Sequence, residues 1–194
     1  DNIVGLISYM RTDSTTLSKD CLKDIDGYLS KKHPQFKSED ERKYSKKVKN
    51  AQEAHEAIRP TSIDNTPEKV KQYLEDQEYK LYDLIWKRTV ASQMTDAVYN
   101  QVTLEFDLSD KYEFRYSGSF LKENGFKEIY DLSDNDEKDK INKKILEDIN
   151  TGDELKINSI NLEQKFTQPP PRYNQASLIQ ALEELGIGRP STYV

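Results

Sequence analysis

The sequence predicts an α+β fold in which a helical part is followed by a strand-rich part. Two patterns lead to this prediction. Before about residue 96 the apolar residues recur at the spacing of an amphipathic helix, whereas between about 98 and 166 they alternate with polar residues, as in a strand. The 194 residues suffice for one large or two small domains, and the 35% hydrophobic content suits a core divided among small modules.

Three helices are expected in the first part. Ser18 suits the N-cap of the first helix, because its hydroxyl can accept a hydrogen bond from the first helical turn. The second begins after Thr66 with Pro67 at its first position, where proline's missing N–H is not needed. The third runs from about Glu75 to Met94, and its Trp86 and tyrosines are expected to belong to the core and not to form base-stacking platforms. The residues expected to face the core are Leu17, Cys21, Leu22, Ile25 and Leu29 in the first helix, and Leu81, Leu84, Ile85 and Met94 in the third.

The strand-rich part opens with a β-hairpin signature. Apolar and polar residues alternate on both sides of Ser109, Asp110 and Lys111, which suit a turn. Further strand is expected from Phe120 through the NGF sequence to Ile129, and a strand pair or bulged strand from 155 to 162. A short buried strand is also expected at the start of the chain. The apolar positions are Val4, Leu6 and Ile7 at the start, Val102, Leu104, Phe106, Leu108, Tyr112, Phe114 and Tyr116 in the hairpin, and Leu155, Ile157, Ile160 and Leu162.

One more helix is expected near the C-terminus, after the stiff connector QPPPR. Asn174 can cap its beginning and Gly186 can end it. Its apolar face comprises Leu178, Ile179, Leu182 and Leu185. The charged stretch from 31 to 52 and the acidic stretch from 134 to 139 are expected to be surface loops. Both ends of the chain lie close to motifs, so we expect the middle part of a longer protein.

Composition narrows the class of protein. The net charge of −6 argues against a generally basic nucleic-acid binder, although a local groove can still bind phosphate. Cys21 is the only cysteine, which excludes disulfides within the chain and cysteine-based metal sites. No signal peptide or apolar run of transmembrane length is present, so we expect a cytoplasmic protein that does not contact membranes.

The stretch GLISYMRTDST, residues 5–15, holds the first candidate site. A phenol such as Tyr9 is a poor nucleophile at neutral pH, and a nearby cation favours its phenolate form. In an extended segment Arg11 projects to the same face as Tyr9, and its guanidinium can bind two phosphate oxygens. The pair therefore suits attack on a phosphodiester, while Thr12, Asp13 and Ser14 can position the loop or contact phosphate. Taken alone, the pattern fits the end of an ordinary strand as well.

A second polar cluster, in AHEAIRP, comprises His55, Glu56 and Arg59. His55 can donate to a phosphate or stabilise developing charge. It does not suit a metal site, since no second histidine follows at helical spacing and carboxylates do not cluster there. Arg172, after the prolines, and Arg189, within GIGRPST, are candidates for phosphate contacts, because glycines there allow the backbone to approach a ligand.

In their order along the chain these motifs resemble the bacterial type IA DNA topoisomerases. The resemblance rests on GLISYMRTDST, AHEAIRP, LYDLIWKRTVASQM and FTQPPPRYNQASLIQALEELGIGRPSTY, and it covers essentially the whole chain. Met10 before RTDS favours the topoisomerase I branch. The resemblance implies that Tyr9 attacks one DNA strand and keeps its 5′-phosphate, that Arg11 holds the scissile phosphate, and that His55 assists beside it. Religation then needs no ATP, and the passage of the second strand relaxes negatively supercoiled DNA.

The resemblance also implies a place within a toroid of four domains. Residues 1–95 correspond to the helical domain that carries the tyrosine, 96–166 to the β-rich arch, and 167–194 to the start of the domain that holds single-stranded DNA. Mg²⁺ is expected to bind to an acidic domain outside this chain, and the fragment itself is expected to bind none. The partner is the single-stranded segment of negatively supercoiled DNA in the nucleoid, and the protein is expected to be a monomer.

Other classes remain open. The chain is compatible with a non-catalytic DNA-binding or scaffold module, although a scaffold does not need Tyr9 beside Arg11. A tyrosine recombinase or a relaxase is disfavoured, because the spread of arginines and histidines before a C-terminal tyrosine, or a histidine cluster for metal, is missing from the sequence. By itself the fragment is expected to fold, to bind single-stranded DNA weakly, and neither to cleave nor to relax DNA.

Overall fold

The computed structural model of the chain describes most of its residues. They are 4–12, 14–44, 56–108, 111–131, 143–146, 148–188 and 192. The acidic stretch from 134 to 139 and residues 45–52 of the predicted charged loop therefore lie outside the described residues. The described part of that loop is not a plain surface loop, because Lys31 and Lys32 belong to a helix, Pro34–Phe36 is a 3₁₀ turn, and Phe36 packs against the core.

The chain divides into two compact units. The first comprises Asp1–Val98, Glu123–Leu132 and Ile179–Val194. The second comprises Tyr99–Lys122 and Ser133–Leu178. Mixed helix and sheet confirm the predicted α+β class. None of the helices in the described ranges is long and apolar enough to cross a membrane.

The first helix of the first unit, α1 (Lys19–Lys32), begins as predicted. The hydroxyl of Ser18 accepts a hydrogen bond from the backbone N–H of Cys21 at 3.3 Å. The helix ends where the N–H of His33 bonds to the carbonyl of Leu29, just before a proline. Its buried residues follow a four-residue spacing and form the inner face: Cys21, Ile25 and Leu29.

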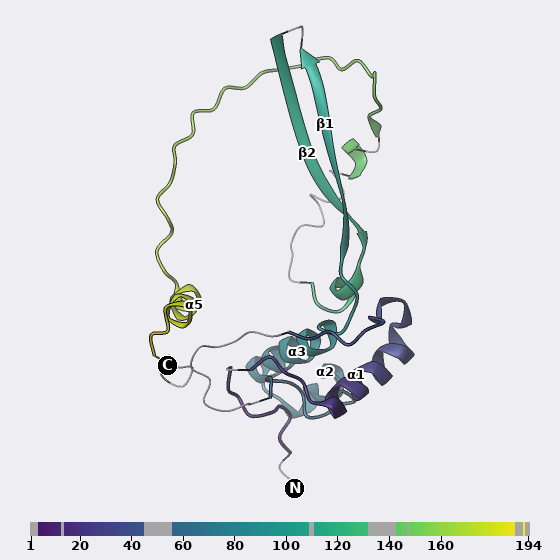
Figure 1. Cartoon of the computed structure of the whole chain (residues 1–194), viewed down its shortest axis with the longest axis vertical. Coiled ribbons are helices and arrows are strands. Elements are labelled where there is room, and N and C mark those ends of the chain that lie inside the picture. The colour runs from purple at the N-terminus through teal and green to yellow at the C-terminus, as the bar shows by residue number, and fades with distance from the viewer. Residues whose placement is uncertain are drawn as a thin grey trace. The chain divides into compact units, whose positions relative to one another are not determined.

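The short helix α2 (Pro67–Val70) and the longer α3 (Asp76–Ala91) pack beside α1 around one core (Figure 1). Helix α3 begins with a capping box in which the side chains of Glu75 and Glu78 each accept a backbone N–H. The buried residues of this core are Cys21, Ile25, Leu29, Ile63, Val70, Tyr82, Trp86, Val90, Ala91 and Met94.

The inward face of α3 differs from the predicted one. Leu81 and Leu84 are exposed, at 55% and 42%. Tyr82 and Trp86 lie on the core side, as predicted for the tryptophan and tyrosines of this helix, and each also bonds a backbone carbonyl of the 63–65 segment at 2.6 and 3.1 Å. These bonds satisfy the polar atoms of Tyr82 and Trp86. The two large aromatic side chains can therefore be buried at no cost in unpaired polar groups, and they take the core positions in place of the leucines. Met94 is buried as predicted.

The predicted hairpin is confirmed. Strand β1 (Val98–Leu108) pairs with β2 (Tyr112–Glu123) in a two-stranded sheet. From position 102 onward, β1 alternates half-buried and exposed residues. Across the strands, the hydroxyls of Thr103 and Ser117 lie 2.9 Å apart, and Arg115 forms an ion pair with Glu105 at 2.6 Å.

The prediction that the strand continues to Ile129 is wrong beyond the end of β2. Gly125–Glu128 is a 3₁₀ turn, and Phe126, Ile129 and Tyr130 pack against the helical core. Gly125 has a φ of +50°, and a Cβ there would lie 2.2 Å from the carbonyl oxygen of Asp96. Glycine is therefore required for the chain to turn back toward the core at this point.

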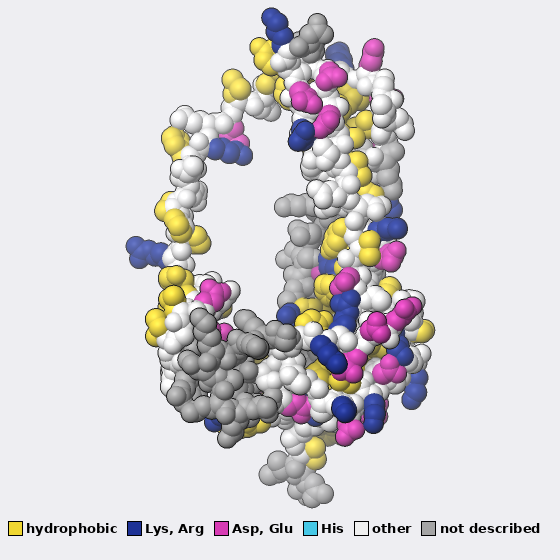
Figure 2. Space-filling model, in the orientation of Figure 1, with side chains coloured by type: hydrophobic (Ala, Val, Ile, Leu, Met, Phe, Trp, Pro, Cys, Tyr) yellow, Lys and Arg dark blue, Asp and Glu magenta, His cyan; other side chains and the backbone are white. Residues whose placement is uncertain are grey.

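The strands predicted from 155 to 162 are wrong, because the chain from 153 to 174 has no regular secondary structure. Its apolar side chains are exposed (Figure 2), with Leu162 at 97%. An alternating pattern forms a strand only when a neighbouring strand accepts its hydrogen bonds, and the described chain supplies none here.

The last helix, α5 (Gln175–Leu185), has the predicted ends. The side chain of Asn174 accepts from the N–H of Ser177 at 2.8 Å, and the serine hydroxyl accepts from the N–H of Asn174 at 2.9 Å. Gly186 follows with a φ of +70°.

Candidate active site

The segment that carries Tyr9 runs beside residues 57–61. Ile7 and Pro60 form an isolated antiparallel bridge, the N–H of Ser8 donates to the carbonyl of Arg59 at 2.8 Å, and the N–H of Thr61 donates to Leu6 at 3.0 Å. The predicted buried strand is thus reduced to this bridge, and Val4 is 66% exposed. The pairing nevertheless fixes the chain immediately before Tyr9.

Residues 9–15 form a loop, and the residues on either side of it, Ser8 and Thr16, both bond to Ala57. On one side, the hydroxyl of Ser8 donates to the carbonyl of Ala57 at 2.7 Å and accepts from the N–H of Arg59 at 3.0 Å. On the other side, the N–H of Ala57 donates to the carbonyl of Thr16 at 2.8 Å. One peptide segment therefore closes both ends of the loop.

Tyr9 and Arg11 lie together on this loop. The Tyr9 side chain is 59% exposed, and the guanidinium carbon of Arg11 lies 5.4 Å from the centroid of its ring. The N–H of Arg11 also donates to the carbonyl of Tyr9 at 2.9 Å. This geometry places a cation beside an accessible phenol, which suits a nucleophile that must approach a negatively charged group.

The remaining described polar residues of the loop bond within the loop or line a cavity. Ser14 accepts a hydrogen bond from the N–H of Thr16 at 3.1 Å, which tightens the turn before the loop closes. Thr12 and Ser14 both line a cavity. Asp13 lies outside the described residues.

Glu56 and Arg59 form a half-buried ion pair at the beginning of α1. The Nε of Arg59 donates to Glu56 at 2.6 Å and one Nη at 3.0 Å, so the pair is bidentate. The other Nη donates to the carbonyl of Pro60 at 2.7 Å, and the N–H of Ser18 donates to Glu56 at 2.8 Å. The guanidinium hydrogen bond from Arg59 holds the pKa of Glu56 below its usual value. These bonds join the 56–60 segment to the N-cap of α1.

The only thiol of the chain is not a competing nucleophile. Cys21 is 4% exposed, and burial raises its pKa to about 11. Because the thiolate is the reactive form, this thiol is inert near neutral pH.

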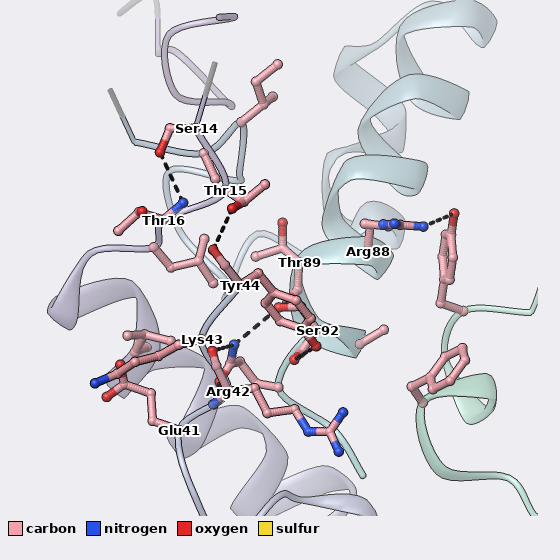
Figure 3. A pocket seen from close by; sticks show the side chains of 18 of the residues that line it. Ser14, Thr15, Thr16, Glu41, Arg42, Lys43, Tyr44, Arg88, Thr89 and Ser92 are labelled. Carbon is pink, nitrogen blue, oxygen red and sulfur yellow. Dashed lines mark hydrogen bonds between the residues drawn. The ribbon is translucent and has the colours of Figure 1, made fainter. Parts of the chain in front are cut away.

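A cavity of about 880 Å³ lies behind the loop (Figure 3). Its wall combines hydroxyl-bearing residues of the loop with basic and acidic side chains and the end of α3; the hydroxyl-bearing residues are Thr12, Ser14, Thr15 and Thr16. Arg88 there donates to the hydroxyl of Tyr130 at 3.1 Å, and its guanidinium lies 5.2 Å from that ring's centroid. Tyr44 lies between the loop and α3, and bonds to both.

The other predicted site residues are distributed along the chain. Arg172 is exposed in the extended stretch before α5, in the second unit. His55 and Arg189 fall outside the described residues. Within the described ranges, no group of three or more histidine, cysteine, aspartate or glutamate side chains is placed to hold a metal ion, so these residues do not fit a magnesium site.

Two residues of the site were not predicted from the sequence. Ser8 closes the loop, and its only signal is a hydroxyl at the end of an apolar run. Tyr44 contacts the loop from a lysine-rich stretch that reads as a plain surface loop. Neither contact follows a local spacing rule, since they join residues 49 and 29 positions apart.

Comparison with known proteins places this geometry in a family. A family model described as DNA topoisomerase matches residues 2–194. The DNA topoisomerase 1 of Rickettsia felis is 47% identical over 192 residues, which cover 98% of this chain and 25% of that protein. The DNA topoisomerase 1 of Xylella fastidiosa (strain Temecula1) is 46% identical over 194 residues, 98% of this chain and 24% of that protein.

The fold agrees with a solved structure. Full-length topoisomerase I from Thermotoga maritima matches with a TM-score of 0.70 and 31% identity, over 98% of this chain and 29% of that chain. The chain spans about a quarter of the length of the curated relatives that it matches. Because the family model covers nearly every residue, the chain belongs to the DNA topoisomerase family.

Proposed function

We propose that this chain is the tyrosine-bearing part of a type IA DNA topoisomerase, an isomerase that relaxes negatively supercoiled DNA without ATP. The observation that carries the proposal is the exposed Tyr9 phenol with the Arg11 guanidinium 5.4 Å from its ring centroid, on a loop with both ends fixed. Membership of the DNA topoisomerase family supports it.

In the proposed reaction, the phenolic oxygen of Tyr9 attacks the phosphorus of one DNA strand. The phenol gives up its proton to solvent, the new bond joins its oxygen to the 5′-phosphate, the bond to the 3′-oxygen breaks, and the 3′-oxygen takes up a proton from solvent and leaves as a hydroxyl. The phosphotyrosine is itself a phosphodiester, so attack by the 3′-hydroxyl restores the strand after the second strand has passed. The Arg11 guanidinium neutralises the charge that builds up on phosphate oxygens during each attack.

The other predicted residues are assigned supporting roles. We place His55 beside the scissile phosphate, and Thr12, Asp13 and Ser14 on the DNA backbone next to it. Arg172 and Arg189 are assigned to phosphates of the same strand. Arg59 is assigned to DNA near the scissile phosphate. Because its guanidinium is ion-paired with Glu56, it acts there by orienting the segment that closes the loop.

The proposed architecture assigns 1–95 to the helical tyrosine domain, 96–166 to a β-rich arch, and 167–194 to the start of a domain that binds single-stranded DNA. Mg²⁺ belongs to acidic ligands elsewhere in the longer protein, and no step above is routed through it. Positioning of the phosphate needs those missing parts, so the 194-residue chain alone is expected to bind single-stranded DNA weakly and to leave it uncleaved. We place the complete protein, as a monomer, on cytoplasmic DNA of the nucleoid.

The test uses a full-length protein that contains this chain. The single-stranded DNA carries its label on the piece that keeps the 5′-phosphate after the cut. The unsubstituted protein should form a labelled covalent adduct that survives denaturation. Tyr9→Phe should form none while keeping its DNA affinity. An adduct that persists in Tyr9→Phe would overturn the proposal. DNA binding without any adduct in the unsubstituted protein would instead favour a non-catalytic module.

A further inference from the structure

The loop that carries Tyr9 has a second attachment, away from Ala57. The hydroxyl of Thr15 donates to the backbone carbonyl of Tyr44 at 2.6 Å. The phenol of Tyr44 donates in turn to the carbonyl of Ser92 at 2.8 Å, at the C-cap of α3 (Figure 3). Two hydrogen bonds thus connect the returning end of the loop, next to Thr16, to the C-cap of α3.

The stretch around Tyr44 is itself held in place. The side chain of Gln93, 8% exposed, accepts from the N–H of Arg42 and donates to its carbonyl, both at 3.1 Å. Arg42 also forms an ion pair with Asp96 at 2.8 Å. Because these contacts fix the backbone two residues before Tyr44, the carbonyl that Thr15 reaches has a defined position.

We propose that Thr15 and Tyr44 are positioning residues for the Tyr9 nucleophile. The proposal rests on the proposed function. The bonds to Ala57 and Arg59 hold the two ends of the loop against a single segment, 57–59, and the loop can still pivot about that segment. The Thr15–Tyr44–Ser92 connection holds the loop at another point, and so restricts where Tyr9 and Arg11 can lie relative to a bound phosphate.

The same contacts contribute little to overall stability, which allows the two roles to be separated. Both hydrogen bonds are exposed, and exposed hydrogen bonds contribute little to folding because water competes for both partners. Misplacing a reacting group by about 1 Å, in contrast, lowers a rate by as much as about 100-fold. Removing the connection should therefore slow cleavage without unfolding the protein.

The experiment compares Thr15→Val with Thr15→Ser in a full-length protein that contains this chain. Valine keeps the shape of threonine and loses the hydroxyl, whereas serine keeps the hydroxyl. We expect Thr15→Val to slow single-turnover adduct formation by about 10-fold or more. Its Kd for the same oligonucleotide should stay within about twofold and its melting temperature should be unchanged. Thr15→Ser should restore most of the rate.

Each alternative result has a defined meaning. Cleavage by Thr15→Val at the unsubstituted rate, or an equal loss in Thr15→Ser, would overturn the positioning role. If the unsubstituted protein forms no adduct at all, the proposed function itself fails, and this outcome is distinct from an adduct that forms at an unaltered rate in Thr15→Val.

A second pair of variants covers the possibility that position 15 does not tolerate valine. Tyr44→Phe removes only the hydroxyl that bonds Ser92 and also contacts Arg42, and Tyr73→Phe removes the hydroxyl of a tyrosine that is 75% exposed. We expect slower adduct formation in Tyr44→Phe, with unchanged Kd, and no change in Tyr73→Phe. Equal rates for the two variants would overturn the role assigned to Tyr44.

Discussion

The guanidinium of Arg11 lies against the ring of Tyr9, with its central carbon 5.4 Å from the ring centroid. Two positions apart in the chain, the two side chains share one face of a loop that is closed at both ends. Any group that approaches the phenol therefore meets the cation as well, and this relationship underlies the first prediction.

Replacing Arg11 should lower the rate of DNA cleavage in the full-length protein. Loss of one group that stabilises transition-state charge costs about 100- to 1,000-fold, and Arg11→Ala is expected to fall in this range. Arg11→Lys keeps the charge but not the two-point contact with phosphate, so it should recover part of the rate. Single-turnover adduct formation measures both. A rate for Arg11→Ala close to that of the unsubstituted protein would remove Arg11 from the mechanism.

Ser8→Ala should destabilise the helical unit. The substitution deletes a donor to the Ala57 carbonyl and an acceptor for the Arg59 N–H, both half-buried, at a cost of about 1–3 kcal/mol. Urea unfolding can be followed by the fluorescence of Trp86, the only tryptophan. Ser159→Ala, in the exposed extended stretch, is the control and should leave the midpoint unchanged. Similar midpoints for the two variants would contradict the prediction.

The Glu56–Arg59 pair should make stability depend on acid pH. The guanidinium lowers the pKa of folded Glu56 below its unfolded value of about 4.3. The stabilisation is therefore complete above that value and is lost as the pH falls from it through the lower folded pKa. Unfolding free energies measured between about pH 6 and 3 should fall less steeply in Glu56→Gln. Parallel curves for the two proteins would show that the pair carries no such linkage.

Two leucines should differ sharply in their contribution to stability. Leu29 is 1% exposed and Leu81 is 55% exposed. Leu29→Ala should cost about 2–5 kcal/mol, because it removes buried methyl groups and leaves a cavity. Leu81→Ala should stay within about 0.5 kcal/mol. Urea titrations of both variants decide the matter, and a large loss in Leu81→Ala would mean that another part of the protein covers this face of α3.

Two glycines should respond to alanine with opposite signs. At Gly125 the positive φ and the 2.2 Å approach of a Cβ to the Asp96 carbonyl predict a loss of more than about 1 kcal/mol. Gly27 lies inside α1 with nothing within 4 Å of a Cβ, so alanine should stabilise the helix by up to about 1 kcal/mol. Thermal unfolding of the two variants should shift in opposite directions, and a shared direction would contradict the local geometry.

Local signals were read correctly from the sequence. Ser18, Pro67 and Asn174 mark helix beginnings because a cap acts within three or four residues of itself. Tyr9 and Arg11 lie together as predicted, although the backbone between them is a tight turn closed by the Arg11 N–H and the Tyr9 carbonyl and not the extended segment expected.

Contacts between distant segments were not predictable in this way. The helical spacing predicts that Leu81 faces inward, but it is exposed, and the carbonyls of the 63–65 segment that bond Tyr82 and Trp86 follow from no local rule. The alternating pattern near Leu155 needed a neighbouring strand that no local rule supplies. Thr15 and Tyr44 meet only because the fold brings together positions 29 apart. His55, in contrast, stays a sequence-based prediction.

The closure of the loop at Ala57 also bears on how this region can change during evolution. Both anchors are groups of the main chain, the carbonyl that receives Ser8 and the N–H that reaches Thr16. Every residue type except proline offers the same two groups. The side chain at this position can therefore drift as far as its surroundings allow, while the anchor persists. Any preference for alanine at this place in the AHEAIRP motif therefore comes from the surroundings of its side chain, which lines the cavity beside the loop, and not from the anchor.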